Sequence, residues 1–123
     1  MVKGIGIDII DVARIKKLVD RDSRFKEKIF TGTEIQYCES KYWREVHYAA
    51  RFAAKEAFFK ALGTGYRGGM KWTDISVENN QLGKPEITLQ GKTLENFKKA
   101  NFKSTHLSIS HTKEYAAAFV IVE

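Results

Sequence analysis

The segment "RFAAKEAFFKALGTG", residues 51–65, decides the fold, because it forms the end of one long apolar helix that runs into a glycine loop. Between residues 46 and 62, 12 of the 17 residues are apolar or aromatic. A helix that is apolar nearly all round is buried on most of its sides. We therefore predict a central helix over residues 44–62, against which the other elements pack.

Four of the five polar residues on this helix fall on two separate stripes. Arg51 and Lys55 share one stripe, and Glu56 and Lys60 share another that lies about 140° away around the helix axis. The ordinary structural interpretation of Glu56 is an i,i+4 ion pair with Lys60. A buried carboxylate can instead take a charged partner or a metal ion from another element. Both interpretations stay open at this point.

The N-terminal strand "VKGIGIDII" offers such a partner. Alternation along the strand divides its residues between two faces, with Ile5, Ile7 and Ile9 on one face and Gly4, Gly6 and Asp8 on the other. Glycines within a strand mark a close approach of a ligand or of another backbone. Asp8 and Glu56 could then share one hard cation, and Mg²⁺ favours one or two carboxylates together with substrate phosphates. Alternatively, Asp8 only ends the strand and caps the next helix.

The remaining patterns complete an α+β fold. They predict a helix capped by Asp11, a capping box at 31–34, a hairpin of strands 74–79 and 85–90, a short helix at 92–100, and strands at 105–111 and 115–123. The last strand is apolar on both faces, so we expect it at the centre of a sheet or in a subunit contact. We predict one domain over residues 1–123, with a small, mostly antiparallel sheet packed on the long helix.

Composition excludes several classes of protein. The chain has 123 residues, of which 43% are hydrophobic and 29% are charged, as in ordinary soluble domains. No apolar run has the length of a membrane span, and the N-terminus does not resemble a signal peptide. Cys38 is the only cysteine, which excludes an internal disulfide and a cysteine-rich zinc site. We expect a cytoplasmic protein that is not associated with a membrane.

Positive charge gathers near the N-terminus. The chain has a formal net charge of +6, and residues 14–28 hold seven basic and three acidic residues, a local net charge of 7 − 3 = +4. Arg14, Lys17 and Arg21 fall on the side of the expected helix opposite its apolar stripe. The charge suggests an anionic partner, although a merely solvated helix face is the simpler alternative.

Two further segments carry weaker signals. The loop "GTGYRGG", residues 63–69, has the glycines of a phosphate cradle but lacks the "GK[ST]" of a Walker A motif, and Gly63 could simply cap the helix. In "HLSISHT", residues 106–112, His111 is either a turn residue or a ligand contact. A serine hydrolase is disfavoured, because the "GxSxG" elbow is missing and neighbouring strand residues point to opposite faces.

Three segments together resemble a known family. "GIGIDIIDVARI" near the N-terminus, "RFAAKEAFFKALGTG" in the middle and "SISHTKEYAAAFV" near the end are similar, in this order, to the holo-acyl-carrier-protein synthases, the small bacterial phosphopantetheinyl transferases. The resemblance implies transfer of 4′-phosphopantetheine from coenzyme A to a serine of an apo acyl carrier protein, with Mg²⁺ as cofactor, in fatty acid biosynthesis. It also implies a homotrimer with active sites between subunits.

The resemblance assigns roles to individual residues. Asp8 and Glu56 match the metal ligands at the diphosphate, and Lys60 matches a lysine beside the diphosphate and the attacking hydroxyl. The expected coenzyme A contacts are Arg51 and His111 on the nucleotide side, Lys60, and the loop residues Gly63, Thr64 and Gly65. The expected contacts with the acidic carrier protein are Arg14, Arg21 and Arg24. Two candidates for the general base remain, Glu56 acting through a water and a metal-bound water or hydroxide.

Two rival functions come from other classes. A small RNA-binding domain would explain the basic charge, but the "GFGFV"-type signature of an RRM is missing and we expect no nucleic-acid partner. A structural trimer with a metal-stabilised core would also retain Asp8 and Glu56. The first rival predicts nucleic-acid binding that depends steeply on salt, and the second predicts no binding of coenzyme A.

Overall fold

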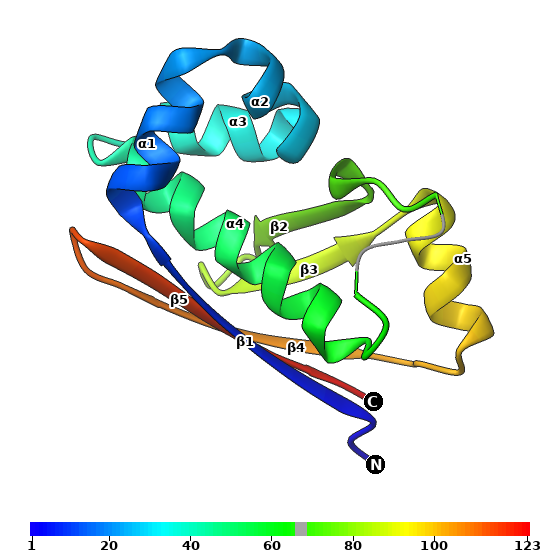
Figure 1. Cartoon of the computed structure of the whole chain (residues 1–123). Helices are drawn as coiled ribbons and strands as arrows, with labels where there is room; N and C mark the ends of the chain where they lie inside the picture. The colour runs from blue at the N-terminus through cyan, green and yellow to red at the C-terminus, as the bar shows by residue number, and fades with distance from the viewer. Residues whose placement is uncertain (66–68) are drawn as a thin grey trace.

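The structure is a computed structural model, and it describes residues 1–65 and 69–123. Its elements follow in the order β1 (Gly4–Asp11), α1 (Val12–Arg21), α2 (Ser23–Ile29), α3 (Gly32–Glu39), α4 (Arg44–Ala61), the 3₁₀ turn η1 (Trp72–Asp74), β2 (Ile75–Asn79), β3 (Pro85–Leu89), α5 (Gly91–Lys99), β4 (Thr105–His111) and β5 (Tyr115–Val122). The long helix α4 lies across one face of a sheet, with α1, α2 and α3 near its start and α5 beyond its end (Figure 1).

Both sheets are antiparallel. One has three strands in the order β1-β5-β4, and the other is the hairpin β2-β3. The prediction that the last strand is central is therefore confirmed. Asp8 pairs with Ala118, and Ala118 pairs in turn with Ile109 of β4. The three-stranded sheet places β1 at one edge and β4 at the other, with β5 between them.

Helix α4 forms the core of the protein. Of its 18 residues, 13 are buried, because β1 and β5 pack on one side of it and α1, α3 and β2 pack on others. Aromatic rings extend this core, and Phe52 stacks on Trp72 with ring centroids 5.4 Å apart. The apolar composition of residues 46–62 is thus explained by burial on nearly every side.

Two glycines of β1 bring the strand against the backbone of α4. A Cβ atom on Gly4 would lie 2.0 Å from the carbonyl oxygen of Ala61, and one on Gly6 would lie 2.0 Å from that of Ala57. Both distances are shorter than any real contact of a Cβ atom, so a side chain at either position would push the strand away. The expected close approach at these glycines is confirmed, with α4 as the approaching backbone.

A buried ion pair joins α3 to α4. Lys55 Nζ lies 2.7 Å from Glu34 Oε1, and both side chains are fully buried. The ammonium also donates to the carbonyl oxygen of Ile29 at 2.6 Å, and Glu34 Oε2 accepts from the backbone N–H of Val77 at 2.7 Å. A buried pair is tolerated when hydrogen bonds satisfy its remaining atoms, as they do here. Lys55 therefore ties together the segments on either side of α4.

The local predictions hold except near residue 22. Asp11 caps α1, Thr31 and Glu34 form the capping box of α3, and the hairpin, the short helix and the C-terminal strands form where expected. The predicted α+β class is confirmed. The helix break after Arg21 was not predicted. Asp22 forms the N-cap of α2 there, because its side chain accepts a hydrogen bond from the backbone N–H of Arg24. Within the described ranges, no helix is both long and apolar enough to cross a bilayer.

The glycine contact predicts a large effect of one methyl group. We expect Gly6→Ala to lower the free energy of unfolding by about 3 kcal/mol, since the new Cβ atom forces the strand from the helix. Chemical denaturation would measure the change. Gly32→Ala is the matched control, because a Cβ atom there meets nothing within 4 Å and should change stability by less than about 1 kcal/mol. Equal stability of the two variants would refute the close approach.

Candidate active site

The first cluster of candidate site residues lies between β1 and the second half of α4. Lys60 Nζ lies 3.2 Å from Asp8 Oδ1 and donates to the carbonyl oxygen of Ile7 at 3.0 Å. The Asp8 side chain is mostly buried, whereas that of Lys60 is about half exposed. Asp8 can reach the helix because the glycines before it remove side chains from the same face of the strand.

Glu56 completes this cluster. Its side chain is half-buried, and its pKa lies above its usual value, first because burial disfavours the charged form and second because the Asp8 carboxylate repels it. Lys60 and Arg14 act in the opposite direction and lower this pKa. Two carboxylates from separate elements therefore face one small region, where a bound cation would relieve their repulsion.

The expected i,i+4 ion pair of Glu56 with Lys60 does not form among the described residues, because the ammonium of Lys60 binds Asp8 and a strand carbonyl instead. The other oxygen of Asp8, Oδ2, is buried and has no hydrogen-bond partner in the described part of the chain. Such an orphaned carboxylate oxygen is suited to a metal ion. The described ranges contain no group of three or more His, Cys, Asp or Glu side chains that could hold a metal ion, so this cluster offers a cation two carboxylates. The donor set thus fits Mg²⁺, which takes one or two carboxylates and completes its shell with water and phosphate oxygens.

A second cluster surrounds Arg51 on the other side of α4. Arg51 is 4% exposed, and its guanidinium carbon lies 4.1 Å from the centre of the Tyr37 ring. Its Nη2 donates to Asn79 Oδ1 at 3.4 Å, a long hydrogen bond, while its Nε has no partner among the described residues. His111 contacts the ring of His47, with centroids 5.7 Å apart. Burial, followed by the charge of Arg51, lowers the pKa of His47.

These side chains line a cavity of about 200 Å³ between the hairpin, α4 and β4. The cavity brings together Arg51 and His111, the two residues to which the family resemblance assigns one side of the ligand, and adds Tyr37, His47 and Asn79, which no sequence motif indicated. His47 carried one available signal, since it lies four residues before Arg51 and therefore on the same stripe of α4. Tyr37 and Asn79 carried none, because only the tertiary fold brings α3 and β2 to this place.

The two clusters do not meet within one chain. Arg51 and Lys60 point away from α4 in roughly opposite directions, since nine helical positions rotate the side chain by about 180°. In the sheet, Asp8 lies on the edge strand β1 and His111 on the opposite edge strand β4, with β5 between them. A ligand that contacts both clusters must therefore reach around the helix or bridge two chains.

The glycine loop follows α4. Gly63 and Gly65 have φ angles of 79° and 70°, which favour glycine, and the N–H of Gly63 donates to the carbonyl oxygen of Lys60 at 3.0 Å. Gly63 therefore acts as a helix cap, as one of the two interpretations held. Thr64 lines a largely apolar cavity of about 440 Å³ with residues of α5. The rest of the predicted loop at 66–68 lies outside the described residues.

The basic face forms as predicted, with one correction. Arg14, Lys17 and Arg21 are exposed on α1, opposite the buried Val12, Ile15 and Val19. Arg24 does not share this helix. It lies on α2, because the chain breaks at Asp22, and its side chain pairs with Asp22 at 2.8 Å.

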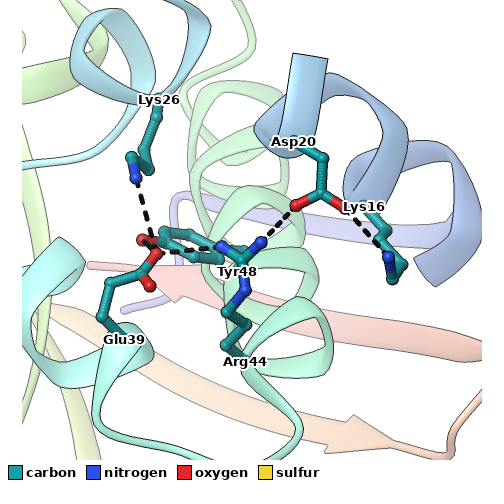
Figure 2. Close-up of polar contacts among 6 residues, drawn as sticks. All are labelled: Lys16, Asp20, Lys26, Glu39, Arg44 and Tyr48. Atoms are coloured by element: carbon teal, nitrogen blue, oxygen red, sulfur yellow. Dashed lines mark hydrogen bonds and ion pairs between the residues drawn. The ribbon is translucent and has the colours of Figure 1, made fainter. Parts of the chain in front are cut away.

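A network of charges fixes α1 to α3 and α4 (Figure 2). Arg44 pairs with Asp20 of α1 and donates to Glu39 of α3 at 2.9 Å. Tyr48 also donates to Glu39, at 2.7 Å. Lys16 and Lys26 approach from the flanks, and Lys16 pairs with Asp20 at 2.9 Å. The basic face of α1 is thus held in one orientation relative to the central helix.

Comparison with known proteins agrees with this arrangement. Residues 4–120 match the family model of the 4′-phosphopantetheinyl transferase superfamily. A holo-[acyl-carrier-protein] synthase from Clostridium tetani is 50% identical, over 100% of this chain and 97% of the relative. The crystal structure of holo-[acyl-carrier-protein] synthase from Neisseria meningitidis has a TM-score of 0.92 and 34% identity, and the match covers 100% of this chain and 99% of that one. A Bacillus anthracis synthase in complex with CoA (3′,5′-ADP) has a TM-score of 0.81 and 39% identity, over 99% and 96% of the two chains.

The matched residues 4–120 include the strand that carries Asp8, the helix that carries Glu56 and Lys60, and most of the C-terminal hairpin that contains His111. The chain therefore belongs to the 4′-phosphopantetheinyl transferase superfamily.

Proposed function

We propose that the chain is a holo-[acyl-carrier-protein] synthase, which transfers 4′-phosphopantetheine from coenzyme A to a serine hydroxyl of an apo acyl carrier protein and releases adenosine 3′,5′-bisphosphate. Relatives of that name match it over 97% or more of their length, and the solved structure of one relative is a complex with CoA (3′,5′-ADP). The observation that carries the proposal is the cluster of Asp8, Glu56 and Lys60. The same proposal places the enzyme in the cytoplasm, in fatty acid biosynthesis.

Asp8 and Glu56 would hold the Mg²⁺ ion. Supporting this assignment, Asp8 Oδ2 is buried and has no hydrogen-bond partner among the described residues, and the pKa of Glu56 is raised first by burial and second by repulsion from the Asp8 carboxylate. The bound ion would neutralise negative charge on the diphosphate and polarise the phosphoryl group that is attacked. Nearby, Lys60 keeps about half of its side chain exposed, so its ammonium is available to a ligand.

The reaction exchanges a phosphoanhydride bond for a phosphoester bond. The serine oxygen of the carrier protein bonds to the phosphorus of the phosphopantetheine group, and the bond from that phosphorus to the bridging oxygen of the diphosphate breaks. Lys60 stabilises the charge that develops on the leaving side. The serine must also lose its proton, and Glu56, whose carboxyl pKa is raised first by burial and second by the Asp8 carboxylate, is one of the two candidate bases.

We propose that the nucleotide end of coenzyme A binds in the second cluster, at Arg51 and His111, and that Gly63, Thr64 and Gly65 contact the molecule near Lys60. The two clusters lie at opposite edges of the sheet. A site that uses both is completed between two chains, with Asp8, Glu56 and Lys60 from one chain and Arg51 and His111 from its neighbour. This arrangement requires self-association.

The outer face of the sheet supports self-association. Ile5, Ile7 and Ile9 are each at least 60% exposed, and Phe119 lies beside Ile7 on the same face. Such a row of exposed apolar side chains marks a contact surface. We propose that three copies of the chain bury it, as the family resemblance implies.

Loss of either carboxylate should abolish transfer. We expect Asp8→Asn and Glu56→Gln each to lower the rate at least about 100-fold, since the site loses charge that holds the cation. The assay incubates enzyme, coenzyme A, Mg²⁺ and apo carrier protein and measures the added phosphopantetheine by mass. Glu95→Gln is the matched control, because Glu95 is exposed on α5, away from both clusters. The metal assignment is wrong if either variant stays active at limiting Mg²⁺, or if a chelator leaves the parent active.

Self-association predicts a defined mass. Light scattering at micromolar concentration should give three times the 14.1 kDa of one chain. Ile7→Glu, which places a charge in the middle of the apolar row, should shift the protein to the mass of one chain. A parent protein that already has the monomer mass would contradict the trimer.

The basic face of α1 predicts a selective defect. Arg14 and Arg21 are exposed, so reversing both to Glu should leave the fold unchanged. Charges at the rim of an interface act on encounter with an oppositely charged partner. The double variant should bind coenzyme A normally, show a KM for the apo carrier protein at least about tenfold higher, and respond less to salt than the parent. An unchanged KM together with an unchanged salt response would mean that this face is only solvated.

A further inference from the structure

One carboxylate interrupts the basic face of α1. Asp20 is exposed near the end of the helix. It lines the same surface hollow as three basic residues, Lys16, Lys17 and Arg21. In the proposed function this face meets an acidic carrier protein, so the charge of Asp20 by itself would oppose docking. The contacts that Asp20 makes indicate a different role.

Asp20 connects α1 to the two helices beside it. Its Oδ1 pairs with Nη2 of Arg44 at the start of α4, and its Oδ2 accepts from Lys16 at 2.9 Å. The other arm of the same guanidinium, Nη1, donates to Glu39 Oε2 of α3 at 2.9 Å. One guanidinium thus joins three helices (Figure 2). Because its donors form a rigid planar fork, the guanidinium holds both carboxylates in a fixed geometry.

Glu39 is itself held from two further sides. The hydroxyl of Tyr48, whose side chain is fully buried, donates to Glu39 Oε2 at 2.7 Å, and Lys26 Nζ lies 3.5 Å from the same oxygen. The hydrogen bond from Tyr48 is the first cause that lowers the pKa of Glu39, so this carboxylate is charged at neutral pH. An isolated surface ion pair contributes little, whereas this bridge belongs to a network with a buried anchor.

Apolar packing alone does not set the direction of the basic face. The buried stripe of α1 consists of Val12, Ile15 and Val19. Such contacts are not directional, so they hold the helix against the core without fixing its rotation as sharply as a hydrogen-bonded ion pair does. The helix ends one residue after Asp20, where no further turn of α1 supports it. The orientation of its last turn therefore depends on the bridge from Asp20 to Arg44.

We propose that Arg44 is a positioning residue for the carrier protein. It holds the last turn of α1 through Asp20, so that Lys17 and Arg21 face the docked partner. This inference rests on the proposed function. Arg44 acts through another residue rather than by contact with the carrier, and the candidate active site lies at the second half of α4. Loss of the bridge should therefore weaken carrier binding while coenzyme A binding and the chemical step stay unchanged.

The test uses two variants that break the same bridge but change the charge in opposite directions. For the parent, Arg44→Gln and Asp20→Asn, the transfer assay would give kcat and the KM for the apo carrier protein, and isothermal titration the Kd of coenzyme A. We expect both variants to raise this KM about three- to tenfold, with kcat and Kd within about twofold of the parent. Asp20→Asn decides the matter, because it removes a negative charge from the basic face and frees Lys16. Charge alone predicts a lower KM for this variant, whereas lost positioning predicts a higher one.

Glu45→Gln is the matched control. Glu45 lies next to Arg44 in the first turn of α4 and forms no ion pair within the described ranges. This variant changes the local charge by the same amount as Asp20→Asn but leaves the bridge intact, so it should not raise the KM. Arg44→Lys keeps the charge without the two-armed fork, and it should recover only part of the lost affinity.

Other outcomes separate this inference from the proposed function. Failure of the parent to transfer phosphopantetheine would refute the proposed function itself. If the parent is active but both variants keep its KM for the carrier, or if Asp20→Asn lowers that KM, Arg44 does not position the docking face. A lower kcat at unchanged KM would show that the bridge only stabilises the fold. Asp20 is exposed, so its variant should fold and give a result even where Arg44→Gln is unstable.

Discussion

Gly4 and Gly6 allow the backbone of β1 to lie directly on the carbonyl groups of α4, and the position of Asp8 depends on this contact. Asp8 follows two residues after Gly6 on the same face of the strand. Its carboxylate forms an ion pair with Lys60 and lies near enough to Glu56 to raise the pKa of that residue. A larger side chain at either glycine would push β1 away from α4 and break the ion pair between Asp8 and Lys60. The constraint that shapes the core therefore also sets the spacing of the proposed metal site.

The same helix separates the functions of neighbouring residues. Lys55 and Glu56 are adjacent in sequence, yet they point to different surroundings. Lys55 is buried in an ion pair with Glu34 that joins α3 to α4, whereas Glu56 faces β1 and remains half-exposed. The buried pair joins α3 to the central helix, and the half-buried carboxylate of Glu56 is left without an ion-pair partner among the described residues. The pair of charged residues in an apolar helix thus has one structural member, Lys55, and one member, Glu56, that we propose to be functional.

Much of this arrangement could be predicted from the sequence, since helical and strand periodicity place Asp8 on the glycine face and Glu56 and Lys60 on one helix stripe. The capping residues Asp11 and Thr31 likewise indicated where helices begin. The partner of Lys55 could not be predicted, because Glu34 already had a local role in the capping box and its second contact is tertiary. Arg51 and His111 could be named in advance as residues of the cavity. Tyr37 and Asn79 could not, because they lie on α3 and β2, which only the tertiary fold brings to this place.

The central claim is that one active site combines Asp8 of one chain with Arg51 of its neighbour. Complementation between two inactive variants tests it most directly. Asp8→Asn and Arg51→Gln chains are co-expressed, purified as mixed assemblies and assayed for transfer of phosphopantetheine. In a random equal mixture, half of the chains carry each intact residue, so ½ × ½, or about one quarter, of the sites should regain activity. A mixture no more active than the two variants measured separately would show that both residues act within the same chain.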